Sequence, residues 1–201
     1  MNVLVEYLVV DAVIGDPDDR FFDGLSSALE DLAGFGVVME LVERDEKPSH
    51  IRISWLDHRS GSAVRMWDDY RAMVRYLELR APDSEMMSRL RTTLEQHLAP
   101  PKRADLVSLA RRAPTDLAAL MRVVYSVEDS PDAETVSIVA AALDHESPAV
   151  RAMASYGAGI LGWPELKRAV EQRRAIDNTV SPVKTAANAT IAMGGGTIAA
   201  R

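Results

Sequence analysis

The sequence predicts an α+β fold: a small N-terminal part of mixed helices and strands with an antiparallel hairpin, followed by an all-α stack of helices. Residues 51–55 alternate apolar and polar side chains, which is the pattern of a half-buried strand. Residues 63–67 follow a polar turn at 57–62 and are expected to form the second arm of a hairpin. From residue 104 onward, apolar residues recur only at the spacing of a helix.

The boundary between the two parts is predicted at Ala99-Pro100-Pro101-Lys102, because two adjacent prolines cannot continue a helix. We therefore expect an α+β region over residues 1–99 and helical repeats over residues 100–196. Residues 197–201 are expected to form a flexible tail.

Within the N-terminal part, residues 3–10 are rich in β-branched side chains and predict a strand, with the start of a buried helix as the alternative. A helix is expected over the apolar residues from Phe21 to Leu32, ended by Gly34 and Gly36 and capped by the preceding aspartates at positions 16, 18 and 19. A strand is predicted over residues 37–43, with a polar turn after it at 44–49. Further helices are expected from Asp68 to Pro82, with Tyr70, Met73, Val74 and Leu77 on one face, and from Asp83 or Ser84 to about Leu98.

The C-terminal part is predicted to contain helices over residues 104–112, 115–126, 133–143 and about 182–193. Between them, residues 144–170 carry the signals of two consecutive helices. Asp144 or Ser147 is expected to cap the first helix, with Pro148 at its first position. Gly162 is expected to end that helix, and Pro164 to begin the next.

Several positions in this stretch resemble a HEAT-like repeat of the type first grouped with phycobilisome lyases. The matching residues are Val150-Arg151, Ala154, Ala158-Gly159, Leu161-Gly162, Pro164-Glu165 and Val170. Trp163 departs from the usual turn aspartate and Ala158 from a leucine, while Asp177, Val183-Lys184 and Ala187 form a weaker second copy. The resemblance implies a stack of helical repeats but no particular activity, since such repeats serve many unrelated functions.

Charge and composition exclude several classes of function. The net charge of −7 argues against general nucleic-acid binding, and the pairs Arg111-Arg112 and Arg173-Arg174 are interpreted as solvated helix faces. The chain has no cysteine, which is compatible with a reducing compartment. The apolar N-terminus is interrupted by Glu6 and Asp11, so neither a signal peptide nor a membrane span is expected and the predicted location is the cytoplasm.

No catalytic residue, metal site or cofactor is predicted. Asp57, His58 and Ser60 are the residue types of a hydrolase triad, but one hairpin turn does not orient them, and the preferences of turns explain all three. The four histidines show no i, i+3 or i, i+4 pairing, so a helical zinc site has no support.

A helical stack offers an extended surface, and an acidic chain attracts basic partners. The predicted function is therefore a non-catalytic module that binds one basic protein, for example a bacterial immunity-type protein that neutralises a toxin. Two alternatives remain open: a small-ligand or chromophore-binding or lyase-like enzyme, and a self-associating scaffold such as a homodimer.

Three residues near the repeat turns are the candidates for partner contact: Trp163, Tyr156 and Arg151. Trp163 is the main candidate, because aromatic residues dominate many protein interfaces. A structural alternative for Arg151 is a salt bridge to Asp177, and a turn tryptophan can equally cover the edge of a core.

Overall fold

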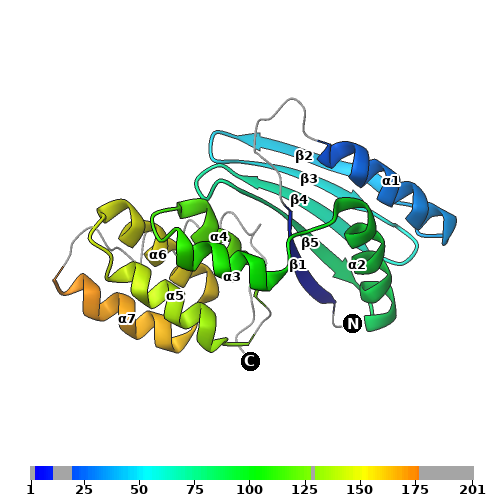
Figure 1. Cartoon of the computed structure of the whole chain (residues 1–201). Coiled ribbons are helices and arrows are strands. Elements are labelled where there is room, and N and C mark those ends of the chain that lie inside the picture. The colour runs from blue at the N-terminus through cyan, green and yellow to red at the C-terminus, as the bar shows by residue number, and fades with distance from the viewer. Residues whose placement is uncertain (1–2, 11–19, 128–129, 177–201) are drawn as a thin grey trace. The chain divides into compact units, whose positions relative to one another are not determined.

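The computed structural model describes residues 3–10, 20–127 and 130–176. The chain divides into two compact units, Met1–Lys102 and Arg103–Arg201. The described part of the first unit contains a sheet and two helices, and that of the second contains helices only (Figure 1). The predicted α+β class is confirmed. No helix among the described residues is long and apolar enough to cross a membrane.

The first unit is built on a five-stranded antiparallel sheet with the order β1-β5-β4-β3-β2, so β1 and β2 are its edge strands. Its elements, in chain order, are β1 (Leu4–Val10), α1 (Phe21–Gly34), β2 (Glu40–Lys47), β3 (His50–Leu56), β4 (Ala63–Asp69), β5 (Val74–Ala81) and α2 (Ser84–Leu98). Both helices pack on the same face of the sheet (Figure 1).

The core of this unit lies between that face and the two helices. The helices supply Leu25, Ala28, Leu32, Leu90 and Leu94, and the strands supply Leu8, Val64, Met66, Leu77 and Leu79. The helices approach closely at Gly24, where an added Cβ would lie 2.9 Å from the carbonyl oxygen of His97. A side chain at this position would push α1 away from the backbone of α2.

The helix predicted from Asp68 to Pro82 is wrong, because this segment completes β4, turns, and forms β5. β5 is an interior strand of the sheet, between β1 and β4, and both of its faces are buried. A strand buried on both faces does not alternate between apolar and polar residues, so the spacing of Val74 and Leu77 resembled that of a helix. Met73 lies in the intervening turn with a φ of 54°.

The predicted strand at residues 37–43 also needs correction, since β2 runs over Glu40–Lys47 and includes most of the predicted polar turn. Its charged residues 43–47 are paired with β3 in an antiparallel ladder. An exposed edge strand tolerates charges that a central strand would not. The aspartates at positions 16, 18 and 19 lie outside the described residues.

The described helices of the second unit are α3 (Arg103–Arg112), α4 (Leu117–Tyr125), α5 (Ala133–Leu143), α6 (Pro148–Leu161) and α7 (Pro164–Arg174). Each helix packs against the next one and against the one after that. α4 and α6 approach closely at Gly157, where an added Cβ would lie 2.9 Å from Val124 Cγ2. The predicted helix over 182–193 lies outside the described residues, as do the residues of the predicted second repeat copy.

The helix ends in the second unit follow local sequence signals with one exception. Gly162 has a φ of 65° and its N–H donates to the carbonyl of Ala158, so it ends α6 as predicted. Pro164 is the first residue of α7, also as predicted. The predicted cap of α6 is wrong in detail: Ser147 occupies the N-cap position without a side-chain hydrogen bond, and Asp144 follows the end of α5.

Asp132 joins three helices of the second unit. Its carboxylate caps α5 by accepting from the N–H groups of Glu134 and Thr135, and it pairs with Arg103 on α3. The Arg103 guanidinium also donates to Ser126 Oγ, beyond the end of α4, at 3.0 Å. Burial raises the pKa of Asp132, but the hydrogen bonds from Thr135 and Glu134 and the charge of Arg103 outweigh it and bring the pKa below 3.8.

Asp132→Asn is therefore expected to change how stability depends on pH. The carboxylate has a lower pKa in the folded chain than in the unfolded chain. It therefore stabilises fully above the unfolded value of about 3.9 and loses this effect as pH falls through the folded value. The amide still caps the helix but does not pair with Arg103, so the variant should lose about 0.2–1 kcal/mol at pH 7. Urea unfolding followed by circular dichroism should show this loss shrinking at acidic pH, and a loss independent of pH would contradict the assignment.

Candidate partner-binding surface

The three residues predicted for partner contact are all buried. Trp163 is 6% exposed, while Tyr156 and Arg151 are each 9% exposed. Trp163 occupies the N-cap position of α7, and the other two lie within α6. The structure therefore places these side chains in the interior of the helical unit, where they support its surface.

Arg151 fixes the connection between α5 and α6. One of its guanidinium nitrogens, Nη1, donates to the backbone carbonyls of His145 at 2.9 Å and Glu146 at 2.6 Å. The alternative partner considered from the sequence, Asp177, lies outside the described residues.

Asp57 organises the hairpin turn between β3 and β4. Its carboxylate accepts from the N–H groups of Arg59 and Ser60 and from the Ser60 hydroxyl. Burial raises the pKa of Asp57, but the hydrogen bonds from Ser60 and Arg59 outweigh it and bring the pKa below 3.8. His58 Nε2 instead lies 3.8 Å from Glu40 Oε2 on β2. These three residues are therefore not arranged as a catalytic triad, and Asp57 serves to cap the backbone of the turn.

The exposed apolar side chains of the first unit include a group between the end of α1 and the first half of β2. This apolar segment consists of Phe35, Val38, Leu41 and Val42, which are 62%, 53%, 61% and 48% exposed. Isolated exposed apolar residues are common, whereas a group along one segment is typical of an interaction site. Sequence reasoning assigned part of this segment to a strand but did not identify it as a site.

The exposure of this segment follows from the position of β2 at the edge of the sheet. The pairing of β2 with β3 shifts register between Leu41 and Glu43, so Val42 lies in a β-bulge. Acidic residues flank the apolar side chains: Glu40 lies near His58, and Glu43 forms an ion pair with Arg52 on β3. We call Glu40 and Glu43, which flank Leu41 and Val42 in the sequence, the acidic border of the apolar segment.

The sheet face opposite the two helices carries a cluster of aromatic and charged residues that the sequence did not predict. Trp67 on β4 and Tyr76 on β5 stack with ring centroids 6.2 Å apart, and the Arg52 guanidinium lies 5.3 Å from the Trp67 ring. Glu78 on β5 accepts hydrogen bonds from Arg65 and from the indole N–H of Trp67.

Trp67, Tyr76 and Glu78 are each 2% exposed or less, so this cluster is part of the interior. Two polar atoms on β3 nevertheless have no hydrogen-bond partner among the described residues. They are Arg52 Nε and Ser54 Oγ, and both are buried. Burial lowers the pKa of nearby His50 below 6.5, and the charge of Lys47 adds to this effect, so the neutral imidazole is favoured.

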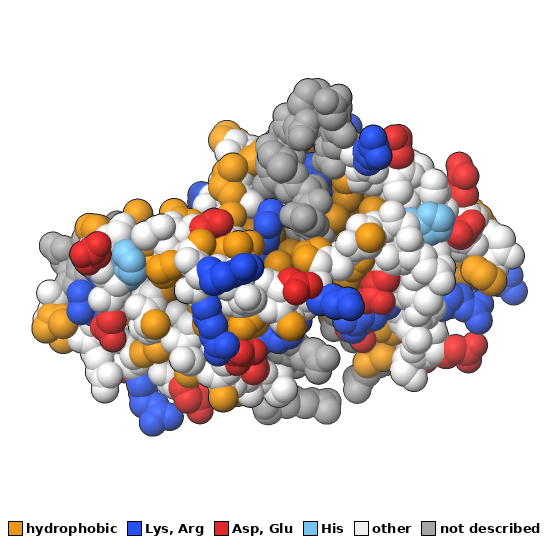
Figure 2. All heavy atoms as spheres, in the orientation of Figure 1, with side chains coloured by type: hydrophobic (Ala, Val, Ile, Leu, Met, Phe, Trp, Pro, Cys, Tyr) orange, Lys and Arg blue, Asp and Glu red, His pale blue; other side chains and the backbone are white. Residues whose placement is uncertain are grey.

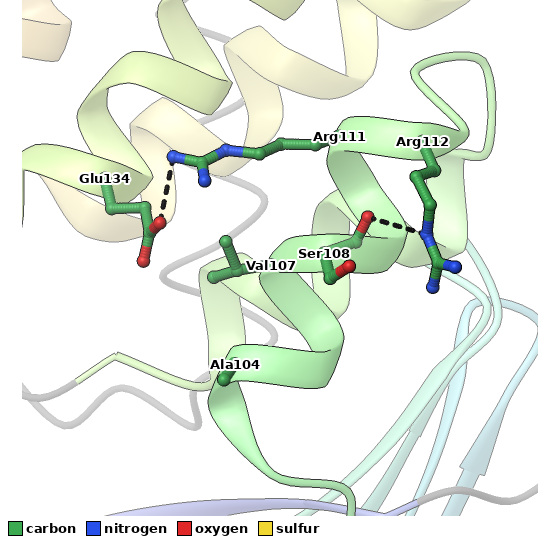
Figure 3. Close-up of a pocket in the computed structure, with 6 residues that line it drawn as sticks. All are labelled: Ala104, Val107, Ser108, Arg111, Arg112 and Glu134. Atoms are coloured by element: carbon green, nitrogen blue, oxygen red, sulfur yellow. Dashed lines mark hydrogen bonds and ion pairs between the residues drawn. The ribbon is translucent and has the colours of Figure 1, made fainter.

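A shallow hollow of about 250 Å³ lies on the second unit, between α3 and α5 (Figure 3). Its lining includes Arg111, which forms an ion pair with Glu134 at 2.9 Å, and Arg112, whose guanidinium donates to the Ser108 carbonyl. Figure 2 shows Lys and Arg side chains over α3 with acidic side chains beside them. Arg111 and Arg112 thus each bind another residue of the helical unit.

The described residues contain no group of three or more His, Cys, Asp or Glu side chains placed to hold a metal ion. Comparison with protein-family models, with curated proteins and with solved structures found no match for this chain.

Proposed function

We propose that this chain is a non-catalytic binding module that engages one basic partner protein through the apolar segment and its acidic border. The observation that carries the proposal is the exposure of Phe35, Val38, Leu41 and Val42 beside Glu40 and Glu43. Apolar side chains supply the burial that stabilises a complex, while the carboxylates attract a basic partner and speed the encounter. A bacterial immunity-type protein that neutralises a toxin is the concrete form of this proposal.

The helical unit supports a HEAT-like interpretation as part of the same proposal. In a stack of helical repeats, each helix contacts its nearest and second-nearest neighbours in the chain. The contacts among α3 to α7 follow this pattern. Such a unit offers a second surface on which a partner can be bound without disturbing the core.

Leu41→Ser combined with Val42→Ser is expected to weaken binding of the partner by about tenfold or more, because central apolar contacts carry most of the energy of an interface. The tagged chain would first be used to capture a partner from its native cells. The isolated partner would then be titrated against the purified chain and the double variant by calorimetry.

Met73→Ser is the matched control for that titration, because Met73 is also an exposed apolar residue, at 53%, but lies in the turn between β4 and β5. Equal affinity of the double variant and the parent chain would contradict the proposed surface. The immunity form of the proposal further requires that the partner inhibit growth when it is expressed alone and that the chain relieve this inhibition.

A role for Trp163, Tyr156 and Arg151 in partner contact remains a prediction. The variant Trp163→Ala distinguishes contact with a partner from packing within the helical unit. Since Trp163 is 6% exposed, the substitution should lower the stability of this unit. Loss of binding without loss of stability would instead assign this side chain to the interface.

A further inference from the structure

We propose that the edge of β2 pairs with the same edge of a second copy of this chain, joining two five-stranded sheets. The pairing segment is residues 43–47, Glu-Arg-Asp-Glu-Lys, which we call the charged edge. This proposal goes beyond the proposed partner and shares only Glu43 with the surface proposed for that partner.

The charged edge has a row of backbone groups with which none of the described strands pairs. β2 is the last strand of the sheet, and among the described strands it pairs with β3 alone. Seven of its eight residues are exposed, and the eighth, Asp45, is half-buried. A strand with one free edge can accept another strand through main-chain hydrogen bonds.

Both ends of the charged edge are defined by the backbone. The bulge at Val42 interrupts the regular ladder before Glu43. Pro48 follows Lys47 and has no N–H to donate to a further ladder. A regular antiparallel pairing between two copies is therefore confined to residues 43–47, which restricts the possible registers.

Symmetry restricts the register further. Two identical antiparallel strands at a sheet edge are related by a two-fold axis perpendicular to the sheet, and such an axis keeps each side chain on its own face. Each residue must then lie opposite one that shares its face. Glu43, Asp45 and Lys47 share one face, opposite Ser54, Arg52 and His50 of β3, while Arg44 and Glu46 share the other.

The charges favour the register centred on Asp45. In that register, Glu43 lies opposite Lys47 of the other copy and Arg44 lies opposite Glu46, and symmetry repeats each pair. Centring on Arg44 would place Glu43 opposite Asp45 and Arg44 opposite itself, whereas centring on Glu46 would place that carboxylate opposite itself. These like-charge contacts disfavour both registers.

One like-charge contact remains in the favoured register, because Asp45 faces Asp45 at the centre. Each of these carboxylates already has cationic neighbours in its own chain: Lys47 at 2.7 Å and Arg52 at 3.9 Å. The Lys47 hydrogen bond is the largest influence on the pKa of Asp45 and lowers it. The central repulsion is thus reduced from within each chain.

The test is a charge reversal measured by sedimentation equilibrium of the full chain at low salt. The parent chain should form a dimer, and Glu43→Lys or Lys47→Glu should each raise the dimer dissociation constant by about tenfold or more, since each reversal turns two attractive contacts into repulsive ones. The double variant Glu43→Lys/Lys47→Glu should restore dimerisation, because the opposite-charge contacts are re-formed with their signs exchanged.

The double variant also separates pairing between copies from damage within one chain. Glu43→Lys places a cation beside Arg52, and Lys47→Glu places an anion beside Asp45, and both effects persist in the double variant. Recovery of the dimer can therefore arise only from contacts between copies. Thermal unfolding would confirm that each variant is folded. The proposal would be overturned if the parent chain stays monomeric at high concentration. It would also be overturned if none of the single charge reversals changes the dimer dissociation constant.

Discussion

Arg75→Met is expected to lower the free energy of unfolding by about 3–5 kcal/mol, because it leaves the carboxylate of Asp68 buried without its cation. Arg75 on β5 and Asp68 on β4 are direct cross-strand neighbours in the sheet. The Arg75 guanidinium donates to both carboxylate oxygens of Asp68, at 2.5 Å and 2.9 Å. Their side chains are only 4% and 6% exposed, so water cannot replace the missing partner.

The same guanidinium also joins the sheet to α1. It lies 4.5 Å from the centroid of the Phe21 ring and 5.4 Å from that of Phe22, at the start of the helix. Methionine fills part of the volume but supplies neither the charge nor the planar contact with these rings. The substitution should therefore loosen the first turn of α1 as well as the contact between β4 and β5.

Urea unfolding followed by circular dichroism would measure this loss, with two further variants as controls. Arg89→Met removes an exposed i, i+4 pair with Glu85 and should cost no more than about 1 kcal/mol. Asp68→Leu combined with Arg75→Met should cost less than the sum of the two single changes, because the double variant leaves neither member of this pair buried without the other. A loss below about 1 kcal/mol for Arg75→Met would show that the pair is not buried in solution.

The Asp68–Arg75 pair also shows why part of the sheet could not be predicted. The sequence predicted a helix over this segment from its apolar residues alone, and it indicated no role for Arg75 or Glu78. Both are buried in β5, where Arg75 pairs with Asp68 on β4 and Glu78 pairs with Arg65 on β4 as well as with Arg80. Which residue lies across a sheet is set by strand order and register, and neither is encoded in the local pattern.

The helical unit was easier to predict because its signals are local. A proline at the first position of α6 and of α7, and a glycine in the left-handed region at the end of α6, act within a few residues of the chain. The hairpin formed by β3 and β4 was predicted for the same reason, since Asp57 and Gly61 define its turn.

The candidate surface could not be predicted, because local sequence patterns do not show which apolar residues are exposed in the fold. Leu41 and Val42 are as apolar as many core residues, and only the edge position of β2 and its bulge leave them exposed. Trp163 and Tyr156 are the opposite case. As aromatic residues near a predicted repeat turn they suggested a contact surface, but both side chains are buried in the structure. Burial, which separates these cases, is decided by packing between distant segments.

Gly157→Leu is expected to destabilise the helical unit by about 1–3 kcal/mol, because the contact between α4 and α6 has no room for a side chain. A Cβ at this position would lie 2.9 Å from Val124 Cγ2 and 3.5 Å from Met121 Sδ. Val124 and Met121 are themselves 2% exposed or less, so neither can move aside into solvent.

Two companion variants separate crowding from the change in helix propensity. Gly157→Ala gains about 1 kcal/mol of helix propensity over glycine, but its Cβ still meets Val124, so its net effect should be small. Combining Gly157→Leu with Val124→Ala removes the atom in closest contact and should recover part of the lost stability.

Hydrogen exchange measured by mass spectrometry can follow the change within the full chain, since peptides from α4 and α6 report on this contact and peptides from β5 serve as an internal reference. Faster exchange in α4 and α6 with unchanged exchange in β5 is the expected result for Gly157→Leu. Equal protection of α4 and α6 in the variant and the parent chain would mean that these helices are not in close contact. Such a result would contradict the close packing of α4 against α6, because an added side chain at Gly157 has no room between these two helices.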